Sequence, residues 1–230
     1  MKGRIGPGLA VVIGALGVFA VVAILFGFTV VTVAEEEAAT VEFDPAAFVD
    51  GVWDNVQTTI NDQAVDLTAI LREIEPDTDG KVPKEALVPV AEQYGLVTPG
   101  DAHVYMVTTT GTVTDVDTET SRGTLGLQVD GYDGPIDVRA YVGPRIPSDE
   151  TSVRDATGII RFGDFREQTE YGKVASEINR RVLTKLSELD TGSLVGQEII
   201  LTGTMMMRTQ NLTQIPVGQL TIVPLEIATQ

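Results

Sequence analysis

The run from Leu9 to Val33 limits this chain more than any other feature, because it holds 25 consecutive uncharged and mostly apolar residues. As a helix it would be about 37 Å long, which is enough to cross the roughly 30 Å hydrocarbon core of a membrane. A cleavable signal peptide has a shorter apolar region, of about 7–15 residues. We therefore expect residues 9–33 to be retained as a transmembrane anchor.

Charges on the two sides of this anchor predict its orientation. Lys2 and Arg4 precede it, and the acidic run 35–37 follows it. The positive-inside rule then places residues 1–8 in the cytoplasm as a short tail. We expect a single-pass protein of the cytoplasmic membrane, with residues 34–43 as a linker and the C-terminal domain outside.

The composition argues against several functions. A formal net charge of −17 repels polyanions, so no nucleic-acid partner is predicted. The 230 residues include no cysteine and one histidine, so a histidine-based zinc site would rest on His103 alone, a residue expected at a strand edge. We predict no metal, no cofactor and no enzymatic activity. A carboxylate-based glycosidase is the catalytic alternative, although no catalytic pair is recognisable from spacing.

Residues 44–98 are predicted to form a small helical subdomain. Asp44 and Pro45 are typical of an N-cap and a first helical position. A second short helix is expected after Asp66, and a third from Val82 to Tyr94. The first helix has an apolar residue at every fourth position, namely Phe48, Val52, Val56 and Ile60.

Residues 99–230 alternate apolar and polar side chains and predict a mostly β domain. Strands are expected at 103–116, 124–131, 136–143, 195–207 and 220–228. A long helix over 164–189, with Asp164 as its cap, lies between the third and fourth strands. The order β-β-β-α-β-β matches a five-stranded OB-like barrel. The predicted fold class is thus α+β: a transmembrane helix, a small helical cluster and an OB-like barrel in which Gly111 marks a bulge or bend.

The stretch from Gly143 to Asn179 concentrates arginines, carboxylates and aromatic rings. Sugar sites combine such hydrogen-bonding side chains with an aromatic surface. The candidate ligand- or partner-binding residues are Arg139, Arg145, Thr151, Arg154, Asp155, Arg161, Phe162, Asp164, Phe165, Gln168, Tyr171 and Asn179. The alternative is that Arg154 and Asp155 form a structural network that locks the stretch onto the barrel.

The same stretch, GPRIPSDETSVRDATGIIRFGDFREQTEYGKVASEIN, is preceded by GTVTDVDTETSRGTL and followed by VGQEIILTGTM. These residues resemble a bacterial family of predicted periplasmic lipoproteins of unknown function, over about Phe43 to Ile227. Genes of that family often accompany sugar ABC transporters, so the resemblance implies a role in sugar uptake. The matching positions are Gly143, Pro144, Thr151, Arg154, Asp155, Phe162, Asp164, Phe165, Gln168, Tyr171 and Asn179.

One departure from the family concerns attachment to the membrane. A lipoprotein needs a cysteine to carry its lipid, and these 230 residues have none. We expect the helix over residues 9–33 to provide the tether instead.

These observations predict a membrane-anchored extracytoplasmic protein, an accessory or ligand- or partner-binding component of a sugar ABC transporter. The expected partners are the transporter permease, a solute-binding protein, a sugar, and the membrane through residues 9–33. The alternative is a structural envelope protein without a small-molecule ligand.

Overall fold

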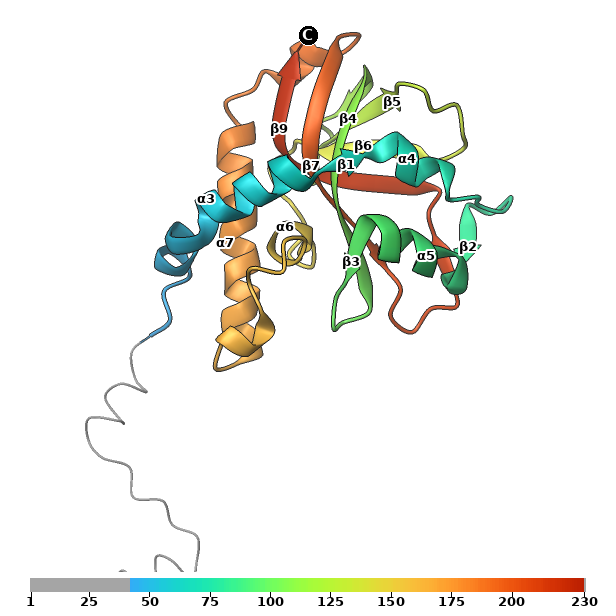
Figure 1. The fold of residues 1–230 in the computed structure, drawn as a ribbon. Helices are drawn as coiled ribbons and strands as arrows, with labels where there is room; N and C mark the ends of the chain where they lie inside the picture. The colour runs from blue at the N-terminus through green and yellow to red at the C-terminus, as the bar shows by residue number, and fades with distance from the viewer. Residues whose placement is uncertain (1–41, 230) are drawn as a thin grey trace, which may run out of the picture. The chain divides into compact units, whose positions relative to one another are not determined.

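The computed structural model describes residues 42–229, and from Asp44 onward the chain forms one compact unit of helices that flank a strand-rich sheet (Figure 1). The helices are α3 (Pro45–Gln63), α4 (Leu67–Arg72), α5 (Lys84–Tyr94), α6 (Ser152–Asp155) and α7 (Gln168–Leu186), with 3-10 turns η1 (Phe162–Asp164) and η2 (Thr191–Leu194). The strands are β1 (Val65–Asp66), β2 (Lys81–Pro83), β3 (Gly95–Val97), β4 (Ala102–Asp117), β5 (Thr124–Val129), β6 (Asp137–Tyr141), β7 (Glu198–Arg208), β8 (Gln214–Pro216) and β9 (Gln219–Thr229).

The main sheet has seven strands in the order β1-β4-β5-β6-β9-β7, with β3 attached to β4 and β7 also paired to β4. Strands β6 and β9 run parallel, whereas the pairs β4–β5, β5–β6, β7–β9 and β4–β7 are antiparallel. The predicted α+β content is confirmed, and β4, β5, β6, α7, β7 and β9 follow the predicted order. The five-stranded barrel needs correction: the pairings return to β4, but β1 and β3 join its edge, and the sheet is not a clear barrel.

Strand β4 changes partner along its 16 residues. Its first part pairs with β7 and its last part with β5, and the two pairings overlap only at Gly111 and Thr112. A Cβ atom at Gly111 would lie 2.4 Å from the backbone oxygen of Gln128. The glycine that predicted a bend therefore permits a close approach between strands, while the pairing irregularity itself lies between Val113 and Asp115.

Four short strands have no counterpart in the sequence prediction. Strand β2 pairs with β8 in a separate two-stranded sheet, where Val82 lies opposite Ile215. The third helix therefore begins at Lys84 instead of Val82, and the polar loop after β7 contains a strand. Strands β1 and β3 add to the edge of β4. Segments of two or three residues are too short to show a period, so only their long-range pairing defines them.

Helix α3 begins at Pro45, as predicted. The Asp44 carboxylate accepts hydrogen bonds from the amides of Ala46 and Ala47 at 2.9 and 3.2 Å, and Asp66 caps α4 in the same way. The buried face of α3 is turned slightly from the predicted stripe. Its buried residues are Val49, Val56 and Ile60, while Phe48 and Val52 are half-buried.

Helix α7 is the predicted long helix, but it begins at Gln168 and ends at Leu186. The Asp164 carboxylate accepts a hydrogen bond from the Arg161 amide at 3.1 Å. Asp164 thus caps the η1 turn instead of the long helix. Leu189, the last residue of the predicted helix, lies beyond the helix and is exposed. The buried apolar residues of α7 are Val174, Ala175, Ile178, Val182 and Leu186.

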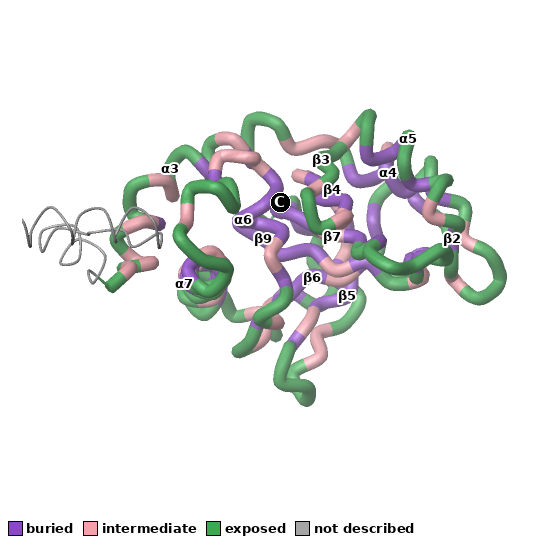
Figure 2. Tube along the Cα trace, turned by 90° about the horizontal axis from the view of Figure 1, so that it is seen from below, coloured by how far each residue is buried: buried purple, intermediate pink, exposed green. Residues whose placement is uncertain are grey.

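The core lies between the sheet and the helices, and Figure 2 shows the buried trace concentrated in the strands. His103 belongs to the row of β4 side chains that face inward, and its side chain is 2% exposed. It pairs with Val97 on one side and Met207 on the other. The prediction that His103 lies at a strand edge is therefore wrong, and burial lowers the pKa of its imidazole.

The predicted membrane anchor, residues 9–33, lies outside the described residues. Among residues 42–229, no helix combines the length and the apolar character needed to span a membrane.

The close approach at Gly111 predicts a specific cost of substitution. In Gly111→Ala the new methyl group would meet backbone, which cannot rotate away, so the free energy of unfolding should fall by about 1–3 kcal/mol. The matched control is Gly172→Ala, because a Cβ at this position in α7 meets nothing within 4 Å. That change should stabilise the helix by up to about 1 kcal/mol. Urea unfolding of the full chain in detergent measures both, and a stable Gly111→Ala variant would contradict the predicted contact.

Candidate functional site

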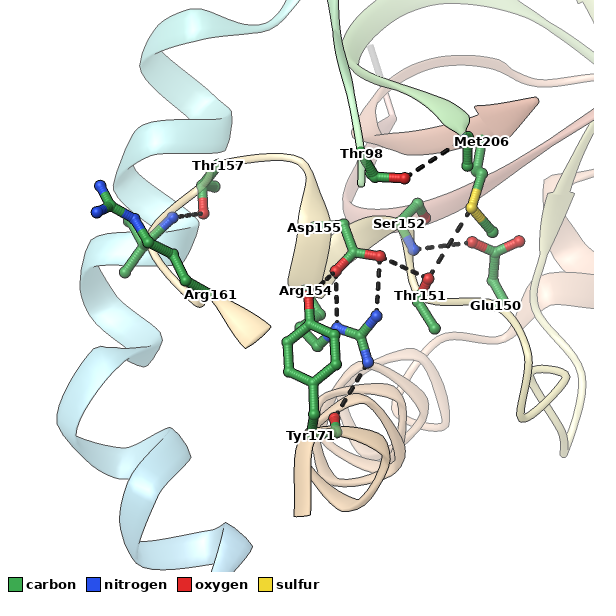
Figure 3. Close-up of polar contacts among 12 residues, drawn as sticks. Thr98, Glu150, Thr151, Ser152, Arg154, Asp155, Thr157, Arg161, Tyr171 and Met206 are labelled. Carbon is green, nitrogen blue, oxygen red and sulfur yellow. Dashed lines mark hydrogen bonds and ion pairs between the residues drawn. The ribbon is translucent and has the colours of Figure 1, made fainter. Parts of the chain in front are cut away.

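The carboxylate of Asp155 is the centre of a buried polar network (Figure 3). Its Oδ1 accepts hydrogen bonds from Arg154 Nε and the Tyr171 hydroxyl, both at 2.7 Å. Its Oδ2 accepts from Arg154 Nη2 at 2.9 Å and from the Thr151 hydroxyl at 2.7 Å. Two bonds to each oxygen fill the acceptor positions of a carboxylate. We call Thr151, Arg154, Asp155 and Tyr171 the Asp155 network.

Arg154 also joins α6 to the start of α7. Its Nη1 donates to the backbone oxygen of Tyr171 at 3.1 Å. Its guanidinium carbon lies 3.5 Å from the centre of the Tyr171 ring, a favourable cation–π arrangement. Because α6 has only 4 residues, it is too short to be stable alone. The Asp155 network therefore supplies the contacts that hold α6 in place.

Because the charged groups of this network are buried, the stability of the protein depends on all of them being hydrogen-bonded. Arg154 is 7% exposed and Asp155 is 8% exposed. A buried ion pair is tolerated when its geometry is good and its remaining polar atoms are bonded. Burial, followed by the hydrogen bond to Asp155, raises the pKa of Tyr171 to about 12, so its hydroxyl remains a donor. A ligand would have to displace donors already in place, so the geometry favours the structural interpretation of Arg154 and Asp155.

A second set of contacts fastens the first residue of α6 and the loop before it. Asn179 on α7 donates to the backbone oxygen of Glu150 at 2.8 Å. The Ser152 hydroxyl lies 2.8 Å from the hydroxyl of Thr204 on β7. Asn179, Ser152 and Thr204 are all buried. The predicted site residue Asn179 thus connects α7 to the loop before α6 through a buried hydrogen bond.

Glu150 is a buried carboxyl group that the sequence analysis did not select. Its Oε1 accepts a hydrogen bond from the Ser152 amide at 3.0 Å. Burial raises the pKa of Glu150, and the bonds from Ser152 offset only part of that effect. The local sequence did not indicate that Glu150 is buried, since the neighbouring residues Asp149 and Thr151 are polar as well. Which acid in this polar run becomes buried depends on how the loop folds against the rest of the protein.

Four aromatic rings form a chain that includes Tyr171 of the Asp155 network. Phe48 lies 5.0 Å from Phe165, and Phe165 lies 5.3 Å from Tyr171, measured between ring centres. Phe162 meets the Tyr171 ring edge-on at 5.5 Å. These contacts link α3, α7 and the segment 161–168, which we call the aromatic turn. Phe48 was assigned only to a core-facing stripe, because nothing local to α3 indicates its partner Phe165.

The remaining predicted site residues lie on the surface or in another part of the sheet. Arg161 and Asp164 belong to the exposed rim of the aromatic turn, and Gln168 is an exposed residue that opens α7. Arg145 is exposed on the loop after β6. Arg139 on β6 pairs with Asp115 at 2.5 Å, apart from the Asp155 network. The twelve predicted residues therefore do not form one site.

Metal binding finds no support in the part of the chain that is described. Residues 42–229 hold no group of three or more histidine, aspartate or glutamate side chains placed to bind a metal ion.

Comparison with solved structures defines the class of fold. The crystal structure of an OB-fold protein from Thermotoga maritima matches with a TM-score of 0.60 and 16% identity, covering 82% of this chain and 99% of that chain. At this identity the likeness shows the fold alone. The chain is therefore an OB-fold-like α+β protein.

A family model for predicted periplasmic lipoproteins (DUF2291) matches residues 18–228. The chain belongs to this family, as the resemblance predicted. The description fits an extracytoplasmic, membrane-anchored protein, although the sequence has no cysteine for a lipid. No curated protein sequence matches the chain.

The Asp155 network predicts that replacing Arg154 with alanine destabilises the protein far more than replacing Arg208. Arg154→Ala leaves a buried carboxylate without its cation and should lower the free energy of unfolding by about 3–5 kcal/mol. Arg208 is the control, because its side chain is 51% exposed and pairs with Asp149, which is 71% exposed. Arg208→Ala should cost less than about 1 kcal/mol. Equal urea midpoints for the two variants would show that the network contributes little.

Glu150 predicts a pH dependence with a definite sign. Because its folded pKa is raised above the ordinary value of 4.5, its favourable contribution is complete below pH 4.5 and is lost as the pH rises through the folded pKa. Glu150→Gln keeps an acceptor for the Ser152 amide and cannot ionise. The variant should therefore gain stability relative to the native chain as the pH rises from about 4 to about 7.5.

Urea unfolding at a series of pH values measures this difference. Asp149→Asn is the control, since its side chain is 71% exposed and should not reproduce the effect. A Glu150→Gln variant whose relative stability does not change with pH would show that burial of this carboxyl has no such effect.

Proposed function

We propose that this protein is a membrane-tethered extracytoplasmic accessory component of a sugar ABC transporter, and that it binds the permease or its solute-binding protein through the aromatic turn. The observation that carries the proposal is the exposure of Phe162, whose side chain is 54% exposed. Among residues 42–229, it is the only aromatic residue in the set of large exposed hydrophobic side chains. The proposed role is binding, without a chemical reaction.

The rigidity of the aromatic turn supports this role. Phe162 contacts Tyr171, and Tyr171 is held by both Arg154 and Asp155. The backbone of the turn is closed by the hydrogen bonds between Arg161 and Asp164. Binding to a turn that is already ordered costs less conformational entropy than ordering a flexible loop. An exposed ring on such a support is suited to act as an interface anchor.

The surroundings of Phe162 also suit a protein partner. Arg161, Asp164 and Glu167 are exposed residues of the same aromatic turn. Protein interfaces commonly place an aromatic anchor at the centre and polar residues at the rim. Both signs of charge occur in this rim, which favours a partner with polar groups of both signs over a strongly charged polymer such as nucleic acid.

Tethering through residues 9–33 completes the proposal. Lys2 and Arg4 before this run, with the acidic residues after it, orient the folded domain toward the outside. The family description supports the same side of the membrane. A tether beside the permease would raise the effective concentration of the domain at its partner, so weak docking would suffice. The connection to sugar transport rests on the family resemblance.

The proposal predicts that Phe162→Ala abolishes partner capture without unfolding the protein. Full-length tagged protein is crosslinked in its native membrane, purified and analysed by mass spectrometry. Loss of a central aromatic anchor should reduce recovery of the transporter subunits at least tenfold, as an interface residue worth 1.4 kcal/mol or more would. The melting temperature should change little.

Leu212→Ala is the matched control, because this side chain is 42% exposed and lies outside the aromatic turn. It should leave recovery unchanged. Equal recovery with Phe162→Ala would rule out the aromatic turn as the docking surface. Failure of the native protein to capture any transporter subunit would favour a structural envelope role, and release of chromophore from aryl-glycosides would contradict a purely binding role.

A further inference from the structure

A polar cleft of about 560 Å³ lies at the tip of the β4–β5 hairpin, away from the Asp155 network. Its size falls within the range of small-molecule sites. It is formed by segments distant in sequence, since the hairpin tip meets β6 and the first residue of β9. We call it the rim cleft, and its lining residues are Asp117, Thr120, Ser121, Arg122, Thr124, Arg139 and Gln219.

The hairpin tip that forms one wall is rigid. The Asp117 carboxylate accepts hydrogen bonds from the Glu119 amide at 2.9 Å and from the Thr120 amide and hydroxyl at 3.2 and 2.9 Å. Gly123 has a φ of +49°, and a Cβ placed on it would lie 2.2 Å from the Cα of Gly143. The tip is thus fastened to the end of β6 by a contact between two glycines, with the Gly123 oxygen accepting from the Gly143 amide at 3.0 Å.

The opposite wall is equally fixed. Arg139 donates from Nε to the Thr124 hydroxyl at 2.9 Å and from Nη2 to Asp115 at 2.5 Å. Asp137 lies 3.8 Å from the same guanidinium group. The side-chain hydrogen bond from Thr120 contributes most to lowering the pKa of Asp117, so the carboxylate in the cleft is ionised at neutral pH. Charges of both signs therefore line the rim cleft.

Three lining groups are not used by the fold. Ser121, Arg122 and Gln219 are exposed, and their side chains have no hydrogen bond or ion pair to any residue between 42 and 229. They supply a hydroxyl, a guanidinium and an amide, which together offer both donors and acceptors. All seven lining residues are polar or charged, so each of them can offer a hydrogen-bonding group to a ligand in the cleft.

We infer that the rim cleft binds a small neutral polyhydroxylated molecule of monosaccharide size, held by Ser121, Arg122 and Gln219. Neighbouring hydroxyls on such a molecule can accept from a guanidinium fork and donate to an amide or carboxylate oxygen. The carboxylates Asp115 and Asp137, which pair with Arg139, and the ionised Asp117 of the cleft disfavour an anionic ligand. This inference does not depend on docking by the aromatic turn, because the two surfaces share no residue.

Thermal unfolding of the full chain in detergent tests the inference with D-ribose, D-xylose, D-glucose, D-galactose and D-glucuronate. A neutral sugar at a hundred times its dissociation constant should raise the melting temperature by several degrees. Arg122→Ala and Gln219→Ala should each lower the affinity for that sugar at least tenfold. Neither substitution should change the melting temperature measured without ligand. Arg145→Ala, an exposed arginine outside the cleft, should bind as the native chain does.

Several results would overturn the inference. If no neutral sugar shifts the melting temperature, or if the shifts are equal in the native chain and in both cleft variants, the rim cleft is not a sugar-binding site. A shift in melting temperature with glucuronate alone would show that the ligand is not a neutral sugar. Phe162→Ala should bind sugar normally, so failure of the rim cleft and failure of partner docking are observed separately.

Discussion

A buried carboxylate needs hydrogen-bond donors, and the donors to Asp155 connect α6, the loop before it and α7. Four hydrogen bonds reach it from three side chains on α6, its preceding loop and α7. Leaving such a charge unpaired in the interior would cost several kcal/mol. The excursion between β6 and α7 has only one short α-helix, of 4 residues, so its conformation depends largely on tertiary contacts, of which the bonds to this carboxylate are the most numerous.

The same excursion connects the two surfaces to which functions are assigned. Near its start, Gly143 packs on Gly123 and fastens the hairpin tip that forms one wall of the rim cleft. Near its end, the aromatic turn rests on Tyr171 and presents Phe162 outward. The polar residues that first suggested a binding site are therefore mainly the support, and the two proposed binding surfaces lie near the two ends of the segment that these residues hold.

Local signals in the sequence predicted many elements correctly, and the errors have a common physical origin. Asp44 and Asp66 cap helices as expected, because capping involves residues only two or three positions away. Asp164 has the same local features but caps the η1 turn, where its carboxylate accepts from the Arg161 amide, and α7 begins only at Gln168. The short strand β2 exists only because β8 lies opposite it. The predicted site residues are spread apart for the same reason, because sequence proximity grouped Arg139 and Arg145 with Arg154, whereas the structure separates them.

By itself, the sequence determined the features that depend on composition and short spacing. These are the long uncharged run, the α+β content, the order of the long strands and helices, the helix caps at Asp44 and Asp66, and the family. Only the tertiary structure decided that Arg154 and Asp155 satisfy each other, that Phe162 remains exposed, and that Arg122 and Gln219 face one cleft. Each of those outcomes depends on which distant groups meet in space, and hydrogen bonds and ring contacts act over a few ångströms that sequence spacing does not encode.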